Sequence, residues 1–472
     1  MRRTSTFGAR RWLVSAALGG ILVLAAWLRI VAVEETAVYH PIRADAKEYY
    51  LSAYNLVFEG TYSRSAARLT SPSAPLPADA RRYPGLPLVI APFIWSNYRT
   101  ILLTRPTVDV DAVLRDVQIV NVAAGVAAVA LVFFAASVAL PSWAALGAAL
   151  LTAISPHLVS FTVYLLTEPI AAMLTCLLLA AAAAVALKRE TARGWGSFVG
   201  IGIIVGVLAM FRPIYLLFAP AIVLAFSGRC PWRKALVGVL IGTVLTVSPW
   251  FVRNAVSVTG RADFGALAAA MMQGTDPDHM LNGDPHTSPN SGLAGPASSK
   301  SHANLLSAVG EIARRFAADP RGMTAWYGFG KMRYLWQWDN TDGVGDVFIY
   351  PVAQTPFTGR TVFGFVHDAV KACHWWLIAL ALAGSIAVWV PAARDLLPRR
   401  GRPVLRAASL LLAYTTVMLI PLITYTRYAV PVFPALFMMA MVPPAMALEA
   451  IARWRRRPLD RAFPGGGRPE QL

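Results

Sequence analysis

The chain has 472 residues, of which 56% are hydrophobic and 14% are charged, and its mean hydropathy is +0.52. A water-soluble fold of this length cannot bury so much apolar surface, so the composition excludes a soluble globular protein and predicts an all-α polytopic membrane protein. The net charge of +18 does not indicate a nucleic-acid partner. Much of the excess lies in short basic clusters beside apolar segments, where anionic membrane lipid and membrane insertion explain it.

Apolar stretches of helical length recur along the chain and predict about ten transmembrane helices. The first is about twenty residues long and lacks a clear small-residue cleavage site, so we expect a retained signal-anchor helix. Several others are short for a hydrocarbon core of about 30 Å, so their ends must be tilted or extended. The expected helices lie near residues 12–33, 115–138, 141–156, 168–187, 195–211, 213–227, 234–252, 372–391, 404–421 and 429–450.

Basic residues in the connections predict which side of the membrane each connection faces. If the N-terminal arginines are cytoplasmic, every short basic connection falls on the same side, as the positive-inside rule requires. Both termini are then cytoplasmic, and two large hydrophilic segments lie outside. The predicted parts are a cytoplasmic N-terminus with the first span (1–33), a first extracytoplasmic loop (34–114), a transmembrane bundle (115–252), a second extracytoplasmic loop (253–371), C-terminal spans (372–450) and a basic cytoplasmic tail (451–472).

Both predicted outer loops contain segments with helical character. In the first, "DAKEYYLSAYNLVF" and the short apolar "YPGLPLVIAPFIW" are typical of helices that lie at the membrane interface. In the second, residues 273–304 are rich in Gly, Pro, Ser, Asn and Asp, which predicts a disordered segment or a mobile lid. Two amphipathic helices are expected after it, in "LLSAVGEIARRFAADP" and "AWYGFGKMRYLWQW".

Arginines gather at the predicted outer side of the membrane, where insertion signals do not require them. They are Arg29, Arg212, Arg253 and Arg427 at the ends of spans, with Arg43 and Arg82 in the first outer loop. Such a set is suited to bidentate binding of a phosphate or diphosphate at the level of the lipid headgroups. For each arginine taken alone, the alternative is a snorkelling side chain that anchors a helix end.

Two carboxylates are candidates for catalysis on the same side. Asp45 lies just outside the first span, and together with Glu48 it has the spacing of a helix-capping pair. Capping is therefore the alternative to a catalytic role. Glu168 precedes a proline at the outer start of a span, where a first-turn carboxylate meets the helix dipole. The functional interpretation places Glu168 in the same outer cavity as Asp45.

The remaining chemistry-bearing residues give weaker signals. Tyrosines and tryptophans near the spans form an interfacial belt by default, and a minority are candidates for stacking on a sugar. His279, His286 and His302 lie in the Gly/Pro-rich segment without the spacing of a metal motif. No Gly-rich phosphate loop, nucleophile elbow or DxD nucleotide-sugar motif occurs in a segment predicted to be cytoplasmic. An enzyme with an outward active side would have to receive its activated substrate attached to a lipid.

Seven motifs follow one another in a recognisable order: "RADAKEYY", "RRYPGLP", "QIVNVAAG", "ISPHLVSFTVYLLTEP", "FRPIYLL", "PWFVRN" and "TRYAVPVFPAL". From about residue 12 to residue 450, this order resembles the GT-C superfamily of integral-membrane glycosyltransferases. The most similar part of the superfamily is the bacterial branch related to protein mannosyltransferases and lipid A aminoarabinose transferases.

The resemblance implies a GT-C-like bundle and an inverting transferase that uses a polyprenyl-phosphate sugar. It implies that Asp45 is the catalytic base and that Arg82 contacts the donor phosphate. Tyr83 stands where the first of two prolines is usual, and Ala46 stands where many relatives carry a second acid. The second departure leaves open whether a divalent cation is required.

Taken together, the sequence predicts an inverting glycosyltransferase that moves a sugar from a polyprenyl-phosphate donor to a lipid, glycan or protein acceptor. The expected site faces the extracytoplasmic side of a bacterial inner (plasma) membrane. Its expected members are Asp45 and Glu168 for catalysis, Arg82, Arg212, Arg253 and Arg427 for the donor phosphate, and Arg43, Glu48, Tyr49 and Tyr83 for the substrate pocket.

The sequence leaves two alternative functions open. A transporter or flippase of a lipid-linked sugar would place charges near the bilayer midplane or show inverted repeats, and the sequence has almost no such charges and no evident repeat. A lipid-linked glycan ligase or polymerase would use the same outward chemistry.

Overall fold

The computed structural model describes residues 3–71, 73–100, 106–188, 194–258, 265–277, 304–341, 343–359 and 361–462. Most of the segment expected to be a mobile lid, together with His279, His286 and His302, lies outside the described residues.

Within these ranges, six helical segments are long and apolar enough to cross a membrane, and a broken helix pair raises the number to seven. This result confirms the prediction of an all-α multi-pass membrane protein. The six are Arg11–Glu35 of α1 (Arg3–Glu35), α5 (Val110–Ala139), α8 (Glu168–Leu187), α11 (Trp232–Ser257), α17 (Val362–Ala387) and Thr426–Arg455, which contains η8 (Thr426–Tyr428), η9 (Val430–Val432), α20 (Phe433–Ala440) and most of α21 (Val442–Ala462).

The other expected spans are helical but fall short of a full crossing in length or apolar character. They are α9 (Trp195–Phe211), the run of η3 (Pro213–Leu217), α10 (Phe218–Ala221) and η4 (Ile222–Phe226), and α19 (Arg402–Leu419). Pro213 explains why α9 stops, because a residue before proline avoids the helical conformation, and Arg212 is extended at φ −140° and ψ 95°. The described part of the chain therefore has fewer full-length spans than the ten expected.

A buried arginine stabilises the break in the third predicted span, near residues 141–156. Here α6 (Ser142–Ile154) gives way to α7 (Pro156–Ser160) and η1 (Phe161–Val163) with a bend of 48°. The last carbonyls of a helix lack backbone partners, which is costly away from water. Arg29 from α1 donates to the carbonyl oxygens of Thr152 (3.3 Å) and Ala153 (3.1 Å) and is 1% exposed. It fits because α5 has Gly125 beside it, where a Cβ would lie 2.1 Å from the Arg29 Nε. Arg29 is thus a helix cap within the protein.

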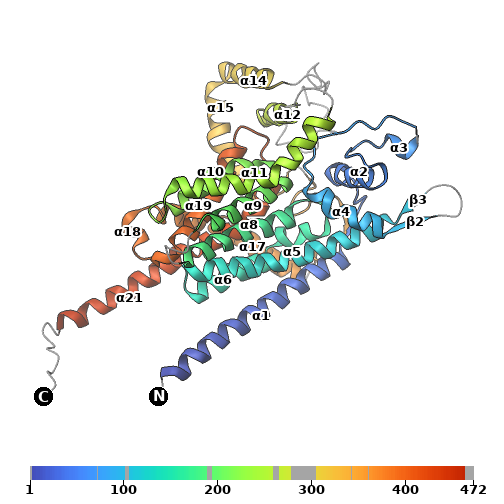
Figure 1. Cartoon of the computed structure of the whole chain (residues 1–472). Coiled ribbons are helices and arrows are strands. Elements are labelled where there is room, and N and C mark those ends of the chain that lie inside the picture. The colour runs from blue at the N-terminus through green and yellow to red at the C-terminus, as the bar shows by residue number, and fades with distance from the viewer. Residues whose placement is uncertain are drawn as a thin grey trace.

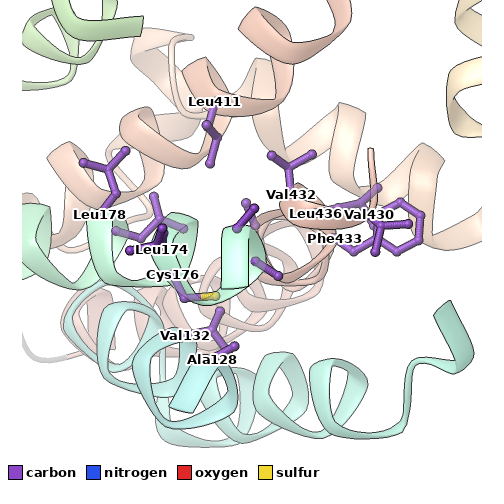
Figure 2. Close-up of a cluster of buried hydrophobic side chains, with 14 of the residues drawn as sticks. Ala128, Val132, Leu174, Cys176, Leu178, Leu411, Val430, Val432, Phe433 and Leu436 are labelled. Carbon is purple, nitrogen blue, oxygen red and sulfur yellow. The ribbon is translucent and has the colours of Figure 1, made fainter. Parts of the chain in front are cut away.

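The helix α8 lies at the centre of the bundle and α1 at its edge. In the most apolar stretch of α8, 72% of the residues are buried inside the protein. In the corresponding stretch of α1, only 22% are buried. Figure 2 shows Leu174 and Leu178 of α8 between Val132 of α5, Leu411 of α19 and residues of η9 and α20. Exposed apolar residues such as Trp12 and Val23 cover the outside of α1, as expected for a surface that contacts lipid.

The two long connections gather at one end of the bundle, opposite the start of α1 and the end of α21 (Figure 1). The strands β1 (Ala37–Val38) and β4 (Val352–Gln354) pair antiparallel and tie the two connections together. The first connection forms α2 (Ala44–Glu59), α3 (Ala67–Thr70), α4 (Gly85–Ser96) and the hairpin of β2 (Tyr98–Thr100) with β3 (Pro106–Val108). The second forms α12 (Gly265–Gly274), α14 (Leu305–Ala318), α15 (Pro320–Ala325), the π-helical turn η6 (Trp326–Gly330) and α16 (Lys331–Trp336). The short α18 (Pro391–Arg394) and η7 (Arg399–Gly401) precede α19.

Candidate active site

A cavity of about 250 Å³ lies where the first connection meets the ends of the membrane helices. Its wall is built from α2, the turn before α4, the start of α8, the α9–η3 junction and the end of α19. Six of the ten predicted site residues line it: Asp45, Tyr49, Arg82, Glu168, Arg212 and Arg427.

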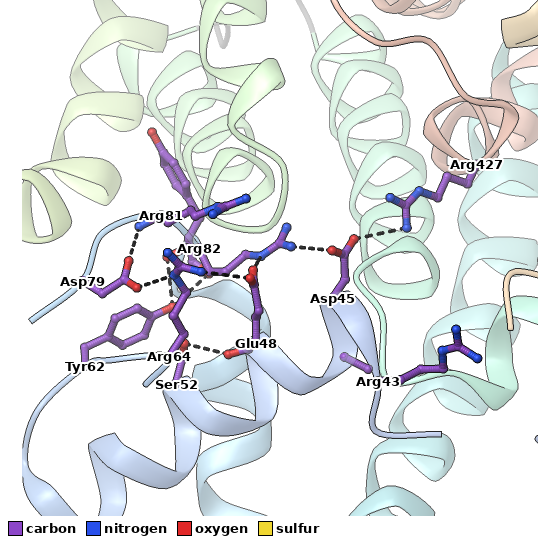
Figure 3. Close-up of polar contacts among 12 residues, drawn as sticks. Arg43, Asp45, Glu48, Ser52, Tyr62, Arg64, Asp79, Arg81, Arg82 and Arg427 are labelled. Atoms are coloured by element: carbon purple, nitrogen blue, oxygen red, sulfur yellow. Dashed lines mark hydrogen bonds and ion pairs between the residues drawn. The ribbon is translucent and has the colours of Figure 1, made fainter. Parts of the chain in front are cut away.

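Asp45 is held between two arginines in the first turn of α2 (Figure 3). Its Oδ1 accepts a hydrogen bond from Nη2 of Arg82, and its Oδ2 lies 3.1 Å from Nη1 of Arg427. Burial alone would raise the pKa of Asp45, but the charges of Arg427 and Arg82 outweigh burial and hold that pKa below its usual value. The carboxylate is therefore ionised at neutral pH.

The capping role that the sequence also allowed for Asp45 is not what the structure shows. Arg43 is the N-cap of α2, and no side chain caps that end. Immediately before Asp45, Ala44 has a φ of +44°, a conformation that residues with a Cβ seldom adopt. Strained backbone of this kind persists where the surrounding structure enforces it, often at functional sites. Here it turns the first residues of α2 so that Asp45 meets arginines from other segments.

Arg82 is held in place by other residues of the first connection. Its Nε donates to Oε2 of Glu48 at 2.5 Å, and its guanidinium lies 5.2 Å from the centre of the Tyr49 ring. The Tyr62 hydroxyl donates to the carbonyl oxygen of Arg82 at 3.0 Å. Burial raises the pKa of Tyr49, so its phenol stays protonated and can donate a hydrogen bond in the pocket.

Glu48 belongs to a chain of alternating charges that leads away from the cavity. Its Oε1 lies 3.0 Å from Nη1 of Arg64, whose Nε lies 2.6 Å from Oδ2 of Asp79 (Figure 3). Glu48 thus orients Arg82 and does not itself line the cavity.

Glu168 and Arg212 form a second ion pair in the cavity wall. Oε1 of Glu168 lies 2.6 Å from Nη2 of Arg212, and Nε of Arg212 donates to the hydroxyl of Thr167 at 3.1 Å. Glu168 lies in the first turn of α8, where its charge meets the helix dipole, and its side chain also lines the cavity. Both positions expected from the sequence are therefore found together. The guanidiniums of Arg212 and Arg427 both lie near the ring of Tyr428, at 5.6 Å and 5.2 Å.

Three other expected site residues lie outside the cavity wall. Arg253 donates to the backbone oxygens of Asp79 (2.6 Å) and Tyr62 (3.0 Å), so it ties the end of α11 to the first connection. Arg43 packs its guanidinium 5.7 Å from the Tyr350 ring and points away from Asp45 in Figure 3. Tyr83 lies with its ring 6.1 Å from that of Trp250.

Part of the cavity wall consists of residues that the sequence does not predict. It comprises Thr167, Tyr215, Ala270, Thr415, Leu419, Leu422, Ile423 and Tyr428, among others. Most are ordinary residues at helix ends and carry no signal of their own. A buried lysine of the second connection, Lys331, donates to the carbonyl oxygens of Ile420 (2.7 Å) and Leu422 (2.8 Å) and so shapes this part of the wall.

No protein-family model matches the sequence, and no curated protein matches it in a sequence search. Solved structures match its architecture. AglB, the archaeal oligosaccharyltransferase from Archaeoglobus fulgidus in complex with an inhibitory peptide and a dolichol-phosphate, gives a TM-score of 0.51 at 16% identity, over 97% of this chain and 53% of its own. The same oligosaccharyltransferase tethered to an acceptor peptide with the NVT sequon gives 0.51 at 16% identity, over 94% and 51%. The chain has the GT-C fold.

The GT-C fold is what these similarities establish, because the identities are low. The chain spans about half the length of the archaeal enzymes. ArnT from Cupriavidus metallidurans bound to undecaprenyl phosphate also matches, with a TM-score of 0.44 at 14% identity, over 97% of this chain and 67% of ArnT.

Metal binding stays an open prediction for this protein. Within the described ranges, no group of three or more His, Cys, Asp or Glu side chains is arranged to hold a metal ion. The two carboxylates of the cavity wall are instead paired with Arg82, Arg427 and Arg212.

Proposed function

We propose that this protein is an inverting glycosyltransferase that takes a sugar from a polyprenyl-phosphate donor. The observation that carries the proposal is the wall of one cavity, where the ionised Asp45 stands with Arg82, Arg212 and Arg427. A base and a set of guanidiniums are what this transfer requires at one place. The GT-C fold is consistent with it, since AglB was solved with a dolichol-phosphate.

In the proposed reaction, Asp45 is the base and the arginines stabilise the leaving group. A lone pair of the acceptor hydroxyl or amine forms a bond to the anomeric carbon of the sugar, while the bond from that carbon to the phosphate oxygen breaks. The electron pair of the broken bond stays on the phosphate, whose charge the guanidiniums offset. The acceptor proton passes to Asp45, which later releases it to water. A single displacement inverts the anomeric configuration.

Glu168 is proposed to act through Arg212. Its side chain is 3% exposed and lies against Arg212, so it fixes the position of that guanidinium at the phosphate end of the cavity. Tyr49, with its protonated phenol, is placed to donate a hydrogen bond to the sugar or the phosphate.

The proposed site faces the extracytoplasmic side. The cavity is lined by residues of both long connections, among them Asp45 and Ala270. These connections gather at one end of the bundle, and α1 starts at the other end (Figure 1). The N-terminal segment that leads into α1 is basic. The positive-inside rule assigns that other end to the cytoplasm. The proposed setting is a bacterial inner membrane, with a lipid, glycan or protein acceptor.

The experiment offers radiolabelled polyprenyl-phosphate sugars to the purified protein in lipid nanodiscs. We expect one sugar label to leave its prenyl carrier and to appear on an acceptor, and a parallel reaction with chelator tests the cation requirement. Movement of the intact lipid-linked sugar across proteoliposomes without cleavage would instead identify a flippase. Retention of every label on its carrier, with acceptors of all three classes present, would contradict the proposal.

A further inference from the structure

Both oxygens of the proposed base are occupied by protein groups. Arg82 donates to Oδ1 of Asp45, and Arg427 lies 3.1 Å from Oδ2. These interactions favour the charged carboxylate and so weaken it as a proton acceptor. Efficient general-base catalysis needs an oxygen that is free to approach the acceptor's proton and a pKa nearer the working pH. This arrangement of Asp45 is therefore a restrained form of the base.

The two arginines are held differently. Arg82 keeps a second carboxylate partner, because its Nε lies 2.5 Å from Glu48, which Arg64 fixes in turn. Loss of its contact with Asp45 would leave Arg82 in place. Arg427 lies near Arg212, because the guanidiniums of both residues contact the ring of Tyr428. The positive charges of these two arginines repel each other. An anion placed between Arg212 and Arg427 would relieve that repulsion.

We propose that Asp45 and the donor phosphate compete for Arg427, so that donor binding frees Oδ2 of Asp45 to act as the base. The inference rests on the proposed function and adds its regulation. The phosphate takes the guanidinium of Arg427 and joins it with that of Arg212, while Arg82 stays on Glu48. The base then becomes competent only in a site that already holds donor. This order protects against activation of an acceptor before a sugar is in place.

Competition makes an unusual prediction, namely that removal of the catalytic charge tightens donor binding. The probe is undecaprenyl phosphate, with undecaprenol as the lipid that lacks the phosphate, and affinities are measured on the full chain in nanodiscs. Asp45→Asn keeps the shape of the side chain but gives up the charge that holds Arg427. We expect undecaprenyl phosphate to bind about tenfold tighter, which corresponds to about 1.4 kcal/mol. Undecaprenol should bind both proteins alike.

Two further variants make the test specific. Asp395→Asn makes the same chemical change at an exposed residue that pairs with Arg402 far from the cavity, and it should bind like the wild type. In an Arg427→Gln background, Asp45→Asn should give no gain, because the contested guanidinium is gone. If Asp45→Asn protein cannot be purified, Asp45→Ser carries the same expectation.

The outcomes separate the two proposals. A wild type that prefers undecaprenyl phosphate over undecaprenol, with unchanged or weaker binding in Asp45→Asn, would overturn the competition and leave the transferase standing. A gain that persists in the Arg427→Gln background would overturn the assignment to Arg427. A wild type with no preference for the phosphate would overturn both the competition and the proposed function.

Discussion

The cavity holds two carboxylate–arginine pairs of the same chemistry in different settings. Asp45 is on a loop helix, its side chain is 26% exposed, and two guanidiniums from distant segments reach it. Glu168 begins a membrane helix, its side chain is 3% exposed, and it lies 2.6 Å from Arg212. We propose that exposure divides the roles of the two carboxylates. The accessible carboxylate can exchange partners and meet a substrate, whereas the buried one keeps an arginine charged and oriented.

The largest expected effect separates the two carboxylates by activity. Asp45→Asn should lower the turnover number by about 10²- to 10⁴-fold, the usual contribution of a positioned base. Its thermal midpoint in detergent should stay near that of the wild type, because its ion pairs are only half-buried and Arg82 keeps Glu48 as a partner. Sugar transfer is measured alongside Asp395→Asn, which should retain full turnover. Unimpaired turnover in Asp45→Asn protein would remove the base assignment.

The second expected effect distinguishes Asp45 from Glu168 by the thermal stability of their variants. Glu168→Gln leaves Arg212 charged in a buried site without its counter-ion, which costs about 3–5 kcal/mol in comparable buried pairs. We expect a marked fall in the thermal midpoint of Glu168→Gln but not of Asp45→Asn. Equal midpoints for the two variants would mean that exposure does not divide their roles. Thermal unfolding followed by intrinsic tryptophan fluorescence measures both.

A smaller effect appears in the pH dependence of kcat/KM. Arg427 holds the pKa of Asp45 down, so the wild-type base stays ionised until the pH falls through that lowered pKa. Arg427→Gln removes one of the lowering charges, and the pKa of Asp45 should rise toward its usual range. The acid limb of the profile should therefore move to higher pH. An acid limb that moves to lower pH, or that stays in place, would contradict the pairing.

The smallest expected effect concerns an arginine outside the cavity. Arg253→Ala removes two contacts to backbone oxygens of the first connection and none to the cavity. We expect donor affinity to fall by a few-fold, less than in Arg427→Gln, through loosening of the segment that carries Arg82. Titration with undecaprenyl phosphate compares the two. A larger loss in Arg253→Ala would show that Arg253 reaches the donor.

Much of the architecture follows from the sequence, because long apolar runs leave a helix as the only structure that satisfies its backbone in lipid. The breaks follow less well. Pro213 marks where α9 ends. The bend between α6 and α7 depends instead on Arg29, which lies more than 120 positions earlier in the sequence. A guanidinium inside the bundle looks the same in sequence as one that faces a ligand.

The same ambiguity limits the prediction of the site. Six of ten expected residues line one cavity, because acids and arginines at the outer ends of spans converge there. Arg253 and Arg43 do not, since each finds its partner in a distant segment, Asp79 and Tyr350 respectively. Thr415, Leu419 and Leu422 were missed because apolar and hydroxyl side chains at a helix end have no distinctive pattern.

The central claim is that this cavity receives a lipid-linked phosphate. A cryo-electron microscopy structure of the protein in nanodiscs with undecaprenyl phosphate tests that claim most directly. We predict that the phosphate lies within hydrogen-bond distance, about 2.7–3.2 Å, of Arg212 and Arg427 and that Asp45 no longer contacts Arg427. A phosphate bound elsewhere on the protein, with the Asp45–Arg427 pair intact, would contradict it.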